Sequence, residues 1–329
     1  MMADVDILKR RAQIVSAIRS FFDGQGFVEV ETPVRIAAPA PEPHIDCPAV
    51  PSLDGGAATF LRASPELQMK KLLAAGMERI YQIGPCFREG ERGSRHSPEF
   101  TMMEWYRRDA DYLAILSDLE RLFCSLVSRF YGDRPLWSHG DRPCTGSHGD
   151  RPCTDASGDS PLRSFLPTIN YQLPALPFKR LTVREAYRRW AGWDPWADWD
   201  QDRFDFDMAT KVEPALKEER AVFLMDYPPQ AASLAKLRGD VAERWEFYVD
   251  GLELANCFTE LCDADEQRRR FAVAREERRQ LGETEYPLDE EFLSVLDGVG
   301  SAAGVALGVD RLVMALLGVP SIAAVRAGS

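Results

Sequence analysis

RHSPEFTMMEWY, residues 95–106, holds an unusual range of chemistry within twelve residues: one arginine, one histidine, two glutamates and three aromatic rings. Side chains alternate between the two faces of a β-strand, so a strand here would place four of them on one face: Phe100, Met102, Glu104 and Tyr106. Burying a carboxylate without a partner is costly. A face that carries a ring, a carboxylate and a phenol is therefore more typical of a binding surface than of a core.

The length and composition are those of a globular protein with one large core or two modest domains. Of the 329 residues, 45% are hydrophobic and 28% are charged, which is ordinary for a soluble protein. No run of about 18 apolar residues predicts a membrane span, and the N-terminus lacks the apolar block of a signal peptide. Seven cysteines, an odd number in a long chain, favour reduced thiols and a cytoplasmic location.

The formal net charge is −12, from 40 basic and 52 acidic residues. Nucleic-acid-binding proteins use a positive surface to displace counterions from phosphate. The net charge therefore argues against extensive contact with RNA. Residues 266–280 are rich in arginine, but acids are interleaved with these bases, which favours the solvated face of a charged helix.

Hydrophobic spacing and capping signals predict a mixture of helices and strands. The segment SPELQMKKLLAAG has Ser64 as a helix N-cap, Pro65 at the first position and Gly76 at the end. Other helices are predicted at residues 6–22, 113–130, 264–281 and 309–318. Strands are predicted at residues 27–34, 79–87, 98–106, 221–228 and 304–308, with a strand pair within 244–261.

The middle of the chain contains a tandem repeat. An eight-residue unit occurs at Ser138–Thr145 and again at Ser147–Thr154. Its histidines and cysteines, His139, Cys144, His148 and Cys153, could form a zinc site. The duplication itself accounts for the matching residues, so we favour a surface loop rich in Gly, Pro, Ser and Asp. We therefore expect one domain over residues 1–329, with a low-complexity insertion at about 132–170.

Two further segments carry charges suited to a ligand. Arg311 follows a predicted tight turn, at a helix N-terminus where peptide dipoles favour anions. Glu253 and Glu260 flank Asn256 and are seven residues apart, so on a regular strand they would face opposite ways. If both serve one site, the chain bulges or turns near Asn256 and Cys257. Such a pair suits Mg²⁺ bound together with substrate phosphates, although two exposed acids of an edge strand would give the same pattern.

The combination is more specific than its parts. Two arginines, Arg88 and Arg311, suit phosphates, the Phe100 ring suits a base, and two acids suit a metal ion. No G-x-x-x-x-G-K-[ST] loop occurs in the sequence. These residues predict a nucleoside triphosphate site of another design.

Three segments identify such a design. GFVEVETPV (26–34), FREGERGSRHSPEFTMMEWY (87–106) and GVALGVDRL (304–312) resemble motifs 1, 2 and 3 of class II aminoacyl-tRNA synthetases, in the lysyl branch. The resemblance runs from about Ile7 to Leu317, apart from the insertion. Lysyl-tRNA synthetases carry an N-terminal OB-fold domain that reads the anticodon, whereas this catalytic core begins almost at residue 1. A stand-alone lysyl core resembles the elongation factor P–lysine ligase family.

The resemblance implies an α+β fold, with an antiparallel β-sheet flanked by helices, and no anticodon-binding domain. It also implies a homodimer formed through motif 1, which ends at Pro33. The cofactors would be ATP and Mg²⁺, and the acceptor would be elongation factor P. A truncated synthetase that charges tRNA, and a non-catalytic paralogue acting as a regulatory subunit, are the alternatives.

Roles for ATP-binding residues follow from the same resemblance. Arg88 and Arg311 would be the catalytic pair, with Arg88 on the α-phosphate and Arg311 between adenine and the γ-phosphate. Phe100 would lie under adenine, and Arg95 and His96 would lie near the phosphate tail. The remaining expected contacts are Glu89 or Glu91 with the adenine amino group, and Glu253 and Glu260 with Mg²⁺.

The substrate implied by the resemblance is lysine or (R)-β-lysine. Glu66 would bind the amino group near the carboxylate, while Glu104 and Tyr106 would bind the distal ammonium. The other expected contacts are Asn256, Glu260, Ser64 and Ala306. Residues like Ser64 and Ala306 accompany acceptance of (R)-β-lysine in the ligase family, which favours that substrate. Cys257 stands where relatives usually have glycine.

Overall fold

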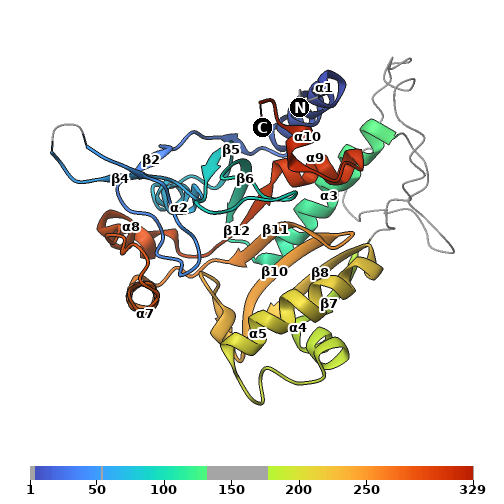
Figure 1. The fold of residues 1–329 in the computed structure, drawn as a ribbon. Coiled ribbons are helices and arrows are strands. Elements are labelled where there is room, and N and C mark those ends of the chain that lie inside the picture. The colour runs from blue at the N-terminus through green and yellow to red at the C-terminus, as the bar shows by residue number, and fades with distance from the viewer. Residues whose placement is uncertain (1–3, 53–54, 132–176, 329) are drawn as a thin grey trace.

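A mostly antiparallel sheet forms the centre of the fold, and Figure 1 shows its strands side by side. The computed structural model describes residues 4–52, 55–131 and 177–328. Within these residues the strand order is β1-β5-β6-β12-β11-β10-β8-β7, and β9 pairs with β10. The pairs β1–β5 and β7–β8 are parallel, and the other neighbours are antiparallel. The repeat and its histidines and cysteines lie outside the described residues.

The bounds of the strands in this sheet are β1 (Val28–Glu29), β5 (Arg79–Phe87), β6 (Glu99–Arg108), β7 (Lys179–Thr182), β8 (Ala221–Tyr227), β9 (Leu237–Arg238), β10 (Val241–Val249), β11 (Leu252–Thr259) and β12 (Ala302–Gly308). A second, small sheet has the order β2-β4-β3, from Arg35–Ile36, Thr59–Leu61 and Ala49–Val50. The strand predicted at 27–34 is therefore shorter than expected. Pro33 has no N–H to donate, and only Val28 and Glu29 pair with β5.

Helices cover both faces of the large sheet (Figure 1). The longer ones are α1 (Val5–Gly24), α2 (Glu66–Ala74), α3 (Tyr112–Tyr131), α7 (Ala264–Leu281) and α9 (Val309–Leu317). The shorter ones are α4 (Val183–Ala186), α5 (Gln201–Asp207), α6 (Glu213–Leu216), α8 (Glu290–Val295) and α10 (Ile322–Val325). Single turns of other helix types occur at Tyr187–Ala191, Met208–Val212, Lys217–Glu219, Pro229–Ala231 and Leu296–Val299. None of the described helices has the length and apolarity needed to cross a membrane. The predicted α+β fold, an antiparallel sheet flanked by helices, is confirmed.

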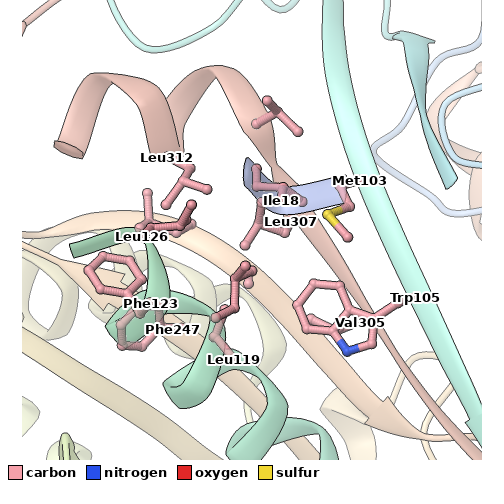
Figure 2. Close-up of a cluster of buried hydrophobic side chains, with 14 of the residues drawn as sticks. Ile18, Met103, Trp105, Leu119, Phe123, Leu126, Phe247, Val305, Leu307 and Leu312 are labelled. Carbon is pink, nitrogen blue, oxygen red and sulfur yellow. The ribbon is translucent and has the colours of Figure 1, made fainter. Parts of the chain in front are cut away.

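The main core lies on one face of the sheet, against α1, α3 and α9 (Figure 2). Met103 and Trp105 of β6 point into it, as do Val305 and Leu307 of β12. The other labelled residues of this core are Ile18, Leu119, Phe123, Leu126, Phe247 and Leu312. Cys257 is also buried in this core, in a strand position opposite Trp245 and Val305. The chain does not turn there, so a glycine is not required at this position.

The alternation of side chains sends the intervening residues to the opposite face. Strand register then aligns one row across five strands: Gln82, Glu104, Ala306, Asn256 and Glu246. A neighbouring row contains Tyr106, Gly304, Phe258 and Arg244. The predicted functional face of residues 100–106 is therefore the face directed away from the main core.

Helix α7 shows why a charged helix can also fix a loop. Most of its arginines pair with acids on the surface, as predicted for a solvated face; Arg279, for example, binds Glu276. Arg278 is different, because it is fully buried. Its guanidinium donates to the backbone carbonyls of Glu42 and Ile45 at 2.8 and 3.1 Å and contacts the Asp46 carboxylate. This arginine ties residues 42–46 to the body of the protein.

We expect Arg278→Met to lower the free energy of unfolding by about 2–4 kcal/mol, because several partly buried acceptors around this fully buried side chain would lose a charged donor. Arg279→Met, on the same helix, should change the stability by less than about 0.5 kcal/mol. Urea denaturation of both variants measures the difference. Equal, small effects would show that Arg278 does not hold the loop.

Candidate active site

A cavity of about 360 Å³ lies on the sheet face opposite the main core. Its floor comes from β6, β11 and β12, and its walls come from the start of α2, the loop between β5 and β6, and the start of α9. The predicted residues that line it are Ser64, Glu66, Arg88, Glu91, Arg95, His96, Phe100, Glu104, Tyr106, Glu253, Asn256, Glu260, Ala306 and Arg311. Glu89 is the exception, because it is exposed and does not line the cavity. The geometry therefore favours Glu91 over Glu89 as a ligand contact.

One end of the cavity is cationic. The Arg311 guanidinium donates to the Glu253 carbonyl at 3.0 Å and lies 3.3 Å from the Glu253 carboxylate. It also lies 2.7 Å from Nε2 of His96. Burial, and next the Arg311 charge, lower the pKa of His96, so this imidazole is neutral near pH 7. Arg88 lies over the Phe100 ring, with Cζ 5.2 Å from the ring centre, and contacts Glu91 at 3.4 Å.

These arginines suit an anion next to a flat ring. A guanidinium presents several N–H donors in one plane and binds phosphate oxygens in pairs. The face of an aromatic ring accepts another planar group by stacking. The cationic end can therefore hold a phosphate chain beside a base.

The other end of the cavity is acidic. Three carboxylates line it, those of Glu66, Glu104 and Glu260. Burial, and next the Glu66 charge, raise the pKa of Glu104 to about 8, although the Tyr106 hydroxyl donates to its carboxylate at 2.7 Å. Burial raises the pKa of Glu260 to about 8, against the opposing effect of Lys70. Both groups would ionise more readily beside a bound cation.

Lys70 is the cation already present at the acidic end. Its Nζ lies 2.5 Å from Oε1 of Glu66 and 2.5 Å from Oε2 of Glu260, and its side chain is 1% exposed. Burial opposes its charge, but the carboxylates of Glu260 and Glu66 keep the pKa of Lys70 above its ordinary value. Sequence reasoning missed this residue. The i, i+4 spacing of Glu66 and Lys70 in a helix was the signal that could have found it.

A β-bulge brings Glu253 to the cavity. Ala255 lies opposite Phe247, but Glu253 lies opposite Tyr248, so Leu254 is an extra residue in β11. The extra residue reverses the alternation, and Glu253 therefore shares a face with Asn256 despite the odd spacing. A bulge was expected, and it lies at Leu254 rather than near Asn256 and Cys257.

The two acids predicted to share a metal ion lie in different surroundings. Burial, and next the Glu246 charge, raise the pKa of Glu253 to about 7, while Arg311 and Arg88 lower it. Glu260 is instead held by Lys70, near Glu66 and Glu104. Glu246, which sequence reasoning missed, is opposite Asn256 in β10. No signal in the sequence singled it out, because its place beside Glu253 depends on the strand register and the bulge.

Glu246 does not line the cavity and is bound by Arg244 and the Tyr248 hydroxyl, so Glu253 is the carboxylate that lies at the cationic end, in contact with Arg311. The sharing of one metal ion by Glu253 and Glu260 stays a prediction. Mg²⁺ commonly takes one or two protein carboxylates and completes its shell with phosphates and water. Among the described residues no group of three or more His, Cys, Asp or Glu side chains could hold a metal ion by itself.

Comparison with known proteins shows to which family the chain belongs. Residues 4–327 match the family model of class II tRNA synthetases (D, K and N). The chain is 36% identical to the elongation factor P–(R)-β-lysine ligase of Proteus mirabilis, over 97% of this chain and 94% of that protein. It is 35% identical to the ligase of the same name from Haemophilus influenzae, over 96% of this chain and 92% of that protein.

A lysine–tRNA ligase from Moorella thermoacetica is 32% identical over 95% of this chain, but the match covers only 62% of that enzyme. The ligases are thus matched over nearly their whole length, and the synthetase over part of it. The predicted resemblance is confirmed: the chain belongs to the class II (D, K and N) tRNA synthetase family and, within it, to the elongation factor P–(R)-β-lysine ligase family.

Proposed function

We propose that this protein is an ATP-dependent ligase that activates (R)-β-lysine or lysine as an aminoacyl-adenylate and transfers it to a lysine ε-amine of elongation factor P. The observation that carries the proposal is one cavity with arginines at one end and three carboxylates at the other. A nucleotide and a diamino acid would meet between these ends. The nearly full-length identity to elongation factor P–(R)-β-lysine ligases supports the same assignment.

The first step joins the amino acid to ATP. The substrate carboxylate attacks the α-phosphorus, and pyrophosphate leaves. Arg88 and Arg311 would hold the phosphates and stabilise the charge that develops on them. Glu253, which lies at the cationic end, would bind Mg²⁺ together with the phosphates, with Glu260 the second ligand that the sequence predicts. Mg²⁺ neutralises phosphate charge when it is bound. The step needs no nucleophile from the protein, because positioning of two bound reactants supplies much of the rate.

Charge balance supports a diamino acid as the substrate. Glu66, Glu104 and Glu260 line the acidic end, and Lys70 is the one cation in contact with this group among the described residues. If all three carboxylates ionise, two negative charges remain uncompensated. Buried charge without a partner is unfavourable. A ligand with two ammonium groups would balance the site.

Small residues make room for such a ligand. Ala306 lies in the row between Glu104 and Asn256. A side chain at the neighbouring Gly304 would collide with the Tyr106 ring and lie 2.7 Å from Oε1 of Glu260. Glycine at 304 and alanine at 306 therefore allow the phenol and carboxylates to surround the ligand. Ser64 is fixed nearby, because its hydroxyl accepts from the Glu66 N–H at 3.0 Å.

We also propose a cytoplasmic homodimer. Strand β1 lies at the edge of the large sheet, and Val28 in it is 52% exposed. An unpaired edge with an apolar side chain is suited to an interface. Among the described residues, Cys47, Cys86, Cys257 and Cys262 are free thiols, which agrees with a reducing compartment. Light scattering tests the dimer.

The assignment is tested by incubating elongation factor P with the protein, ATP, Mg²⁺ and either (R)-β-lysine or α-lysine. Mass spectrometry should show addition of one residue, with (R)-β-lysine preferred. A parallel reaction replaces elongation factor P with tRNA. Charging of tRNA without modification of the protein acceptor would favour a truncated synthetase, and no product in either reaction would favour a regulatory paralogue.

Arg88→Ala should reduce ATP–pyrophosphate exchange about 1000-fold, because the α-phosphate would lose its main cation. Arg92→Ala is the matched control, since Arg92 is exposed on the same loop and does not line the cavity. Thermal melting should be similar for both variants. Retention of most exchange activity by Arg88→Ala would contradict its role.

Glu104→Gln should raise the KM for the amino acid about 100-fold at pH 8, which corresponds to roughly 2.7 kcal/mol. The raised pKa of Glu104, about 8, means that the empty site holds a proton at pH 7. An ammonium ligand binds the ionised carboxylate, so the KM of the unmodified enzyme should fall as the pH rises from 6 to 8. Amines with a pKa near 10.4 stay charged over this range.

The slope of KM against pH should be smaller in Glu104→Gln, because one of the two titrating carboxyls is gone. Glu99→Gln is a suitable control, because Glu99 begins the same strand but is exposed and bonded to Arg326. Pyrophosphate exchange measured at several pH values gives both results. An unchanged KM would exclude Glu104 from substrate binding.

A further inference from the structure

Glu42 is a carboxylate of the cavity that neither sequence reasoning nor the first reaction step uses. It lines the main cavity, and it also lines a small side pocket of about 20 Å³. Ile45, Ser64 and Glu66 line both spaces as well. Glu42 therefore lies at the wall where a narrow side space meets the site.

The backbone around Glu42 is fixed from outside the cavity. Buried Arg278 donates to the Glu42 carbonyl at 2.8 Å, and the Tyr286 hydroxyl accepts from the Cys47 N–H at 2.8 Å. No described group is a hydrogen-bond donor to the Glu42 carboxylate, whereas Glu66 and Glu260 are bound by Lys70. The loop is thus held firmly while its carboxylate is left for another partner.

Charged groups from both ends of the cavity act on the Glu42 carboxylate. On α2, the Glu66 carboxylate disfavours its ionisation and Lys70 favours it; Arg88 of the loop after β5 and Arg244 of β10 also favour it. The Cys47 thiol of its own loop is a further titratable neighbour. Burial, and next Glu66, raise the pKa of Glu42. Glu42 lines the same cavity as Glu66 of the acidic end and Arg88 of the cationic end, so it borders the space where the two ends meet and an acyl–phosphate bond would form.

The second reaction step needs a group at this junction. The acceptor is an alkylamine, which is an ammonium ion at neutral pH because its pKa is near 10.4. An ammonium ion has no lone pair and must lose a proton before it attacks. The other carboxylates have partners, since Tyr106 donates to Glu104 and Lys70 contacts Glu66 and Glu260. His96 faces the Arg311 guanidinium.

Resting on the function proposed above, we propose that Glu42 binds the acceptor ammonium and acts as the base of the transfer step. Its carboxylate takes one proton from the ammonium ion, which becomes a neutral amine. The amine lone pair forms a C–N bond with the acyl carbon, and the C–O bond to the phosphate breaks. The electron pair of the broken C–O bond and the second amine proton leave with AMP, so the product is an amide. Glu42 then loses its proton to water and is ready for the next turnover.

The test compares two half-reactions in Glu42→Gln, Glu42→Asp and the control Glu78→Gln, in which an exposed glutamate outside the cavity is changed. Pyrophosphate exchange reports adenylate formation. Single-turnover transfer from the enzyme-bound adenylate, to elongation factor P or to hydroxylamine, reports the second step. Hydroxylamine is mostly uncharged at pH 7 and needs no base to remove a first proton.

Glu42→Gln should slow transfer to elongation factor P at least about 50-fold more than it slows exchange, within the range for loss of a general base. Transfer to hydroxylamine should fall much less. The residual transfer to elongation factor P should rise about tenfold per pH unit between pH 7 and 9, as free amine becomes available, with a shallower rise in the unmodified enzyme. Glu42→Asp keeps the charge and should retain part of the transfer rate.

Equal losses in exchange and transfer would overturn the proposal and make Glu42 a residue that binds the amino acid. Equal losses with both acceptors would also overturn it, because a change of shape would then be the cause. Glu42→Asp supplies the same comparison if Glu42→Gln melts at a much lower temperature than the control. Absence of exchange in the unmodified enzyme would instead overturn the proposed function, and the base with it.

Discussion

The two faces of one sheet are the constraint on which the site depends. Trp105, Val305, Cys257 and Trp245 are aligned across four strands and are buried against α1, α3 and α9. The next residue in each strand belongs to the row Glu104, Ala306, Asn256 and Glu246. A slip of one residue would move the carboxylates into the core and the indoles to the cavity. The burial of large apolar side chains on one face therefore fixes the position of every charged group on the other.

In the empty protein, the carboxyl groups of the acidic end lie in surroundings that disfavour their ionised forms. Glu104 and Glu260 each have a raised pKa of about 8, chiefly through burial. Ionising these carboxyl groups near pH 7 costs free energy, and the charge of Lys70 offsets only part of that cost. A ligand that binds the folded state stabilises it. The same interactions that make the empty site unfavourable thus favour a dicationic substrate over a monoamine.

Local signals in the sequence were enough for the elements and for most of the cavity lining. The alternation in residues 100–106 and the turn before Arg311 each depend on neighbours within a few residues, and each is present in the structure. The helix predicted after Ser64 also forms, but it begins one residue later than predicted, with Pro65 rather than Ser64 as its N-cap. The resemblance to class II synthetases then linked these segments, which periodicity alone could not bring together.

What could not be predicted depends on three-dimensional register. Glu253 faces the cavity only because of the bulge at Leu254. Glu42 reaches the cavity because Arg278, more than 230 residues away in the chain, fixes its loop. Strand β1 is shorter than its sequence pattern, because pairing with β5 ends after Glu29. Each of these features needs a contact between distant segments, for which a single sequence gives no spacing rule.

The ion pairs of the empty site differ between its two ends in a way that suits a two-step reaction. At the cationic end, Arg88 contacts Glu91 at 3.4 Å and Arg311 contacts Glu253 at 3.3 Å, and all four side chains are 22–38% exposed. Loose, partly exposed pairs contribute little, so phosphates can replace the carboxylates with little loss.

At the amino end, both contacts of Lys70 measure 2.5 Å and are buried, with Glu66 and Glu260 at most 15% exposed. Breaking such a pair would leave an uncompensated buried charge, so this end should stay fixed through a turnover. In the proposed reaction, pyrophosphate and AMP would each leave the cationic end, whereas the acyl group would stay bound at the acidic end across both steps. The weak ion pairs of the cationic end suit ligands that leave, and the strong, buried ion pairs of the acidic end suit a group that stays bound.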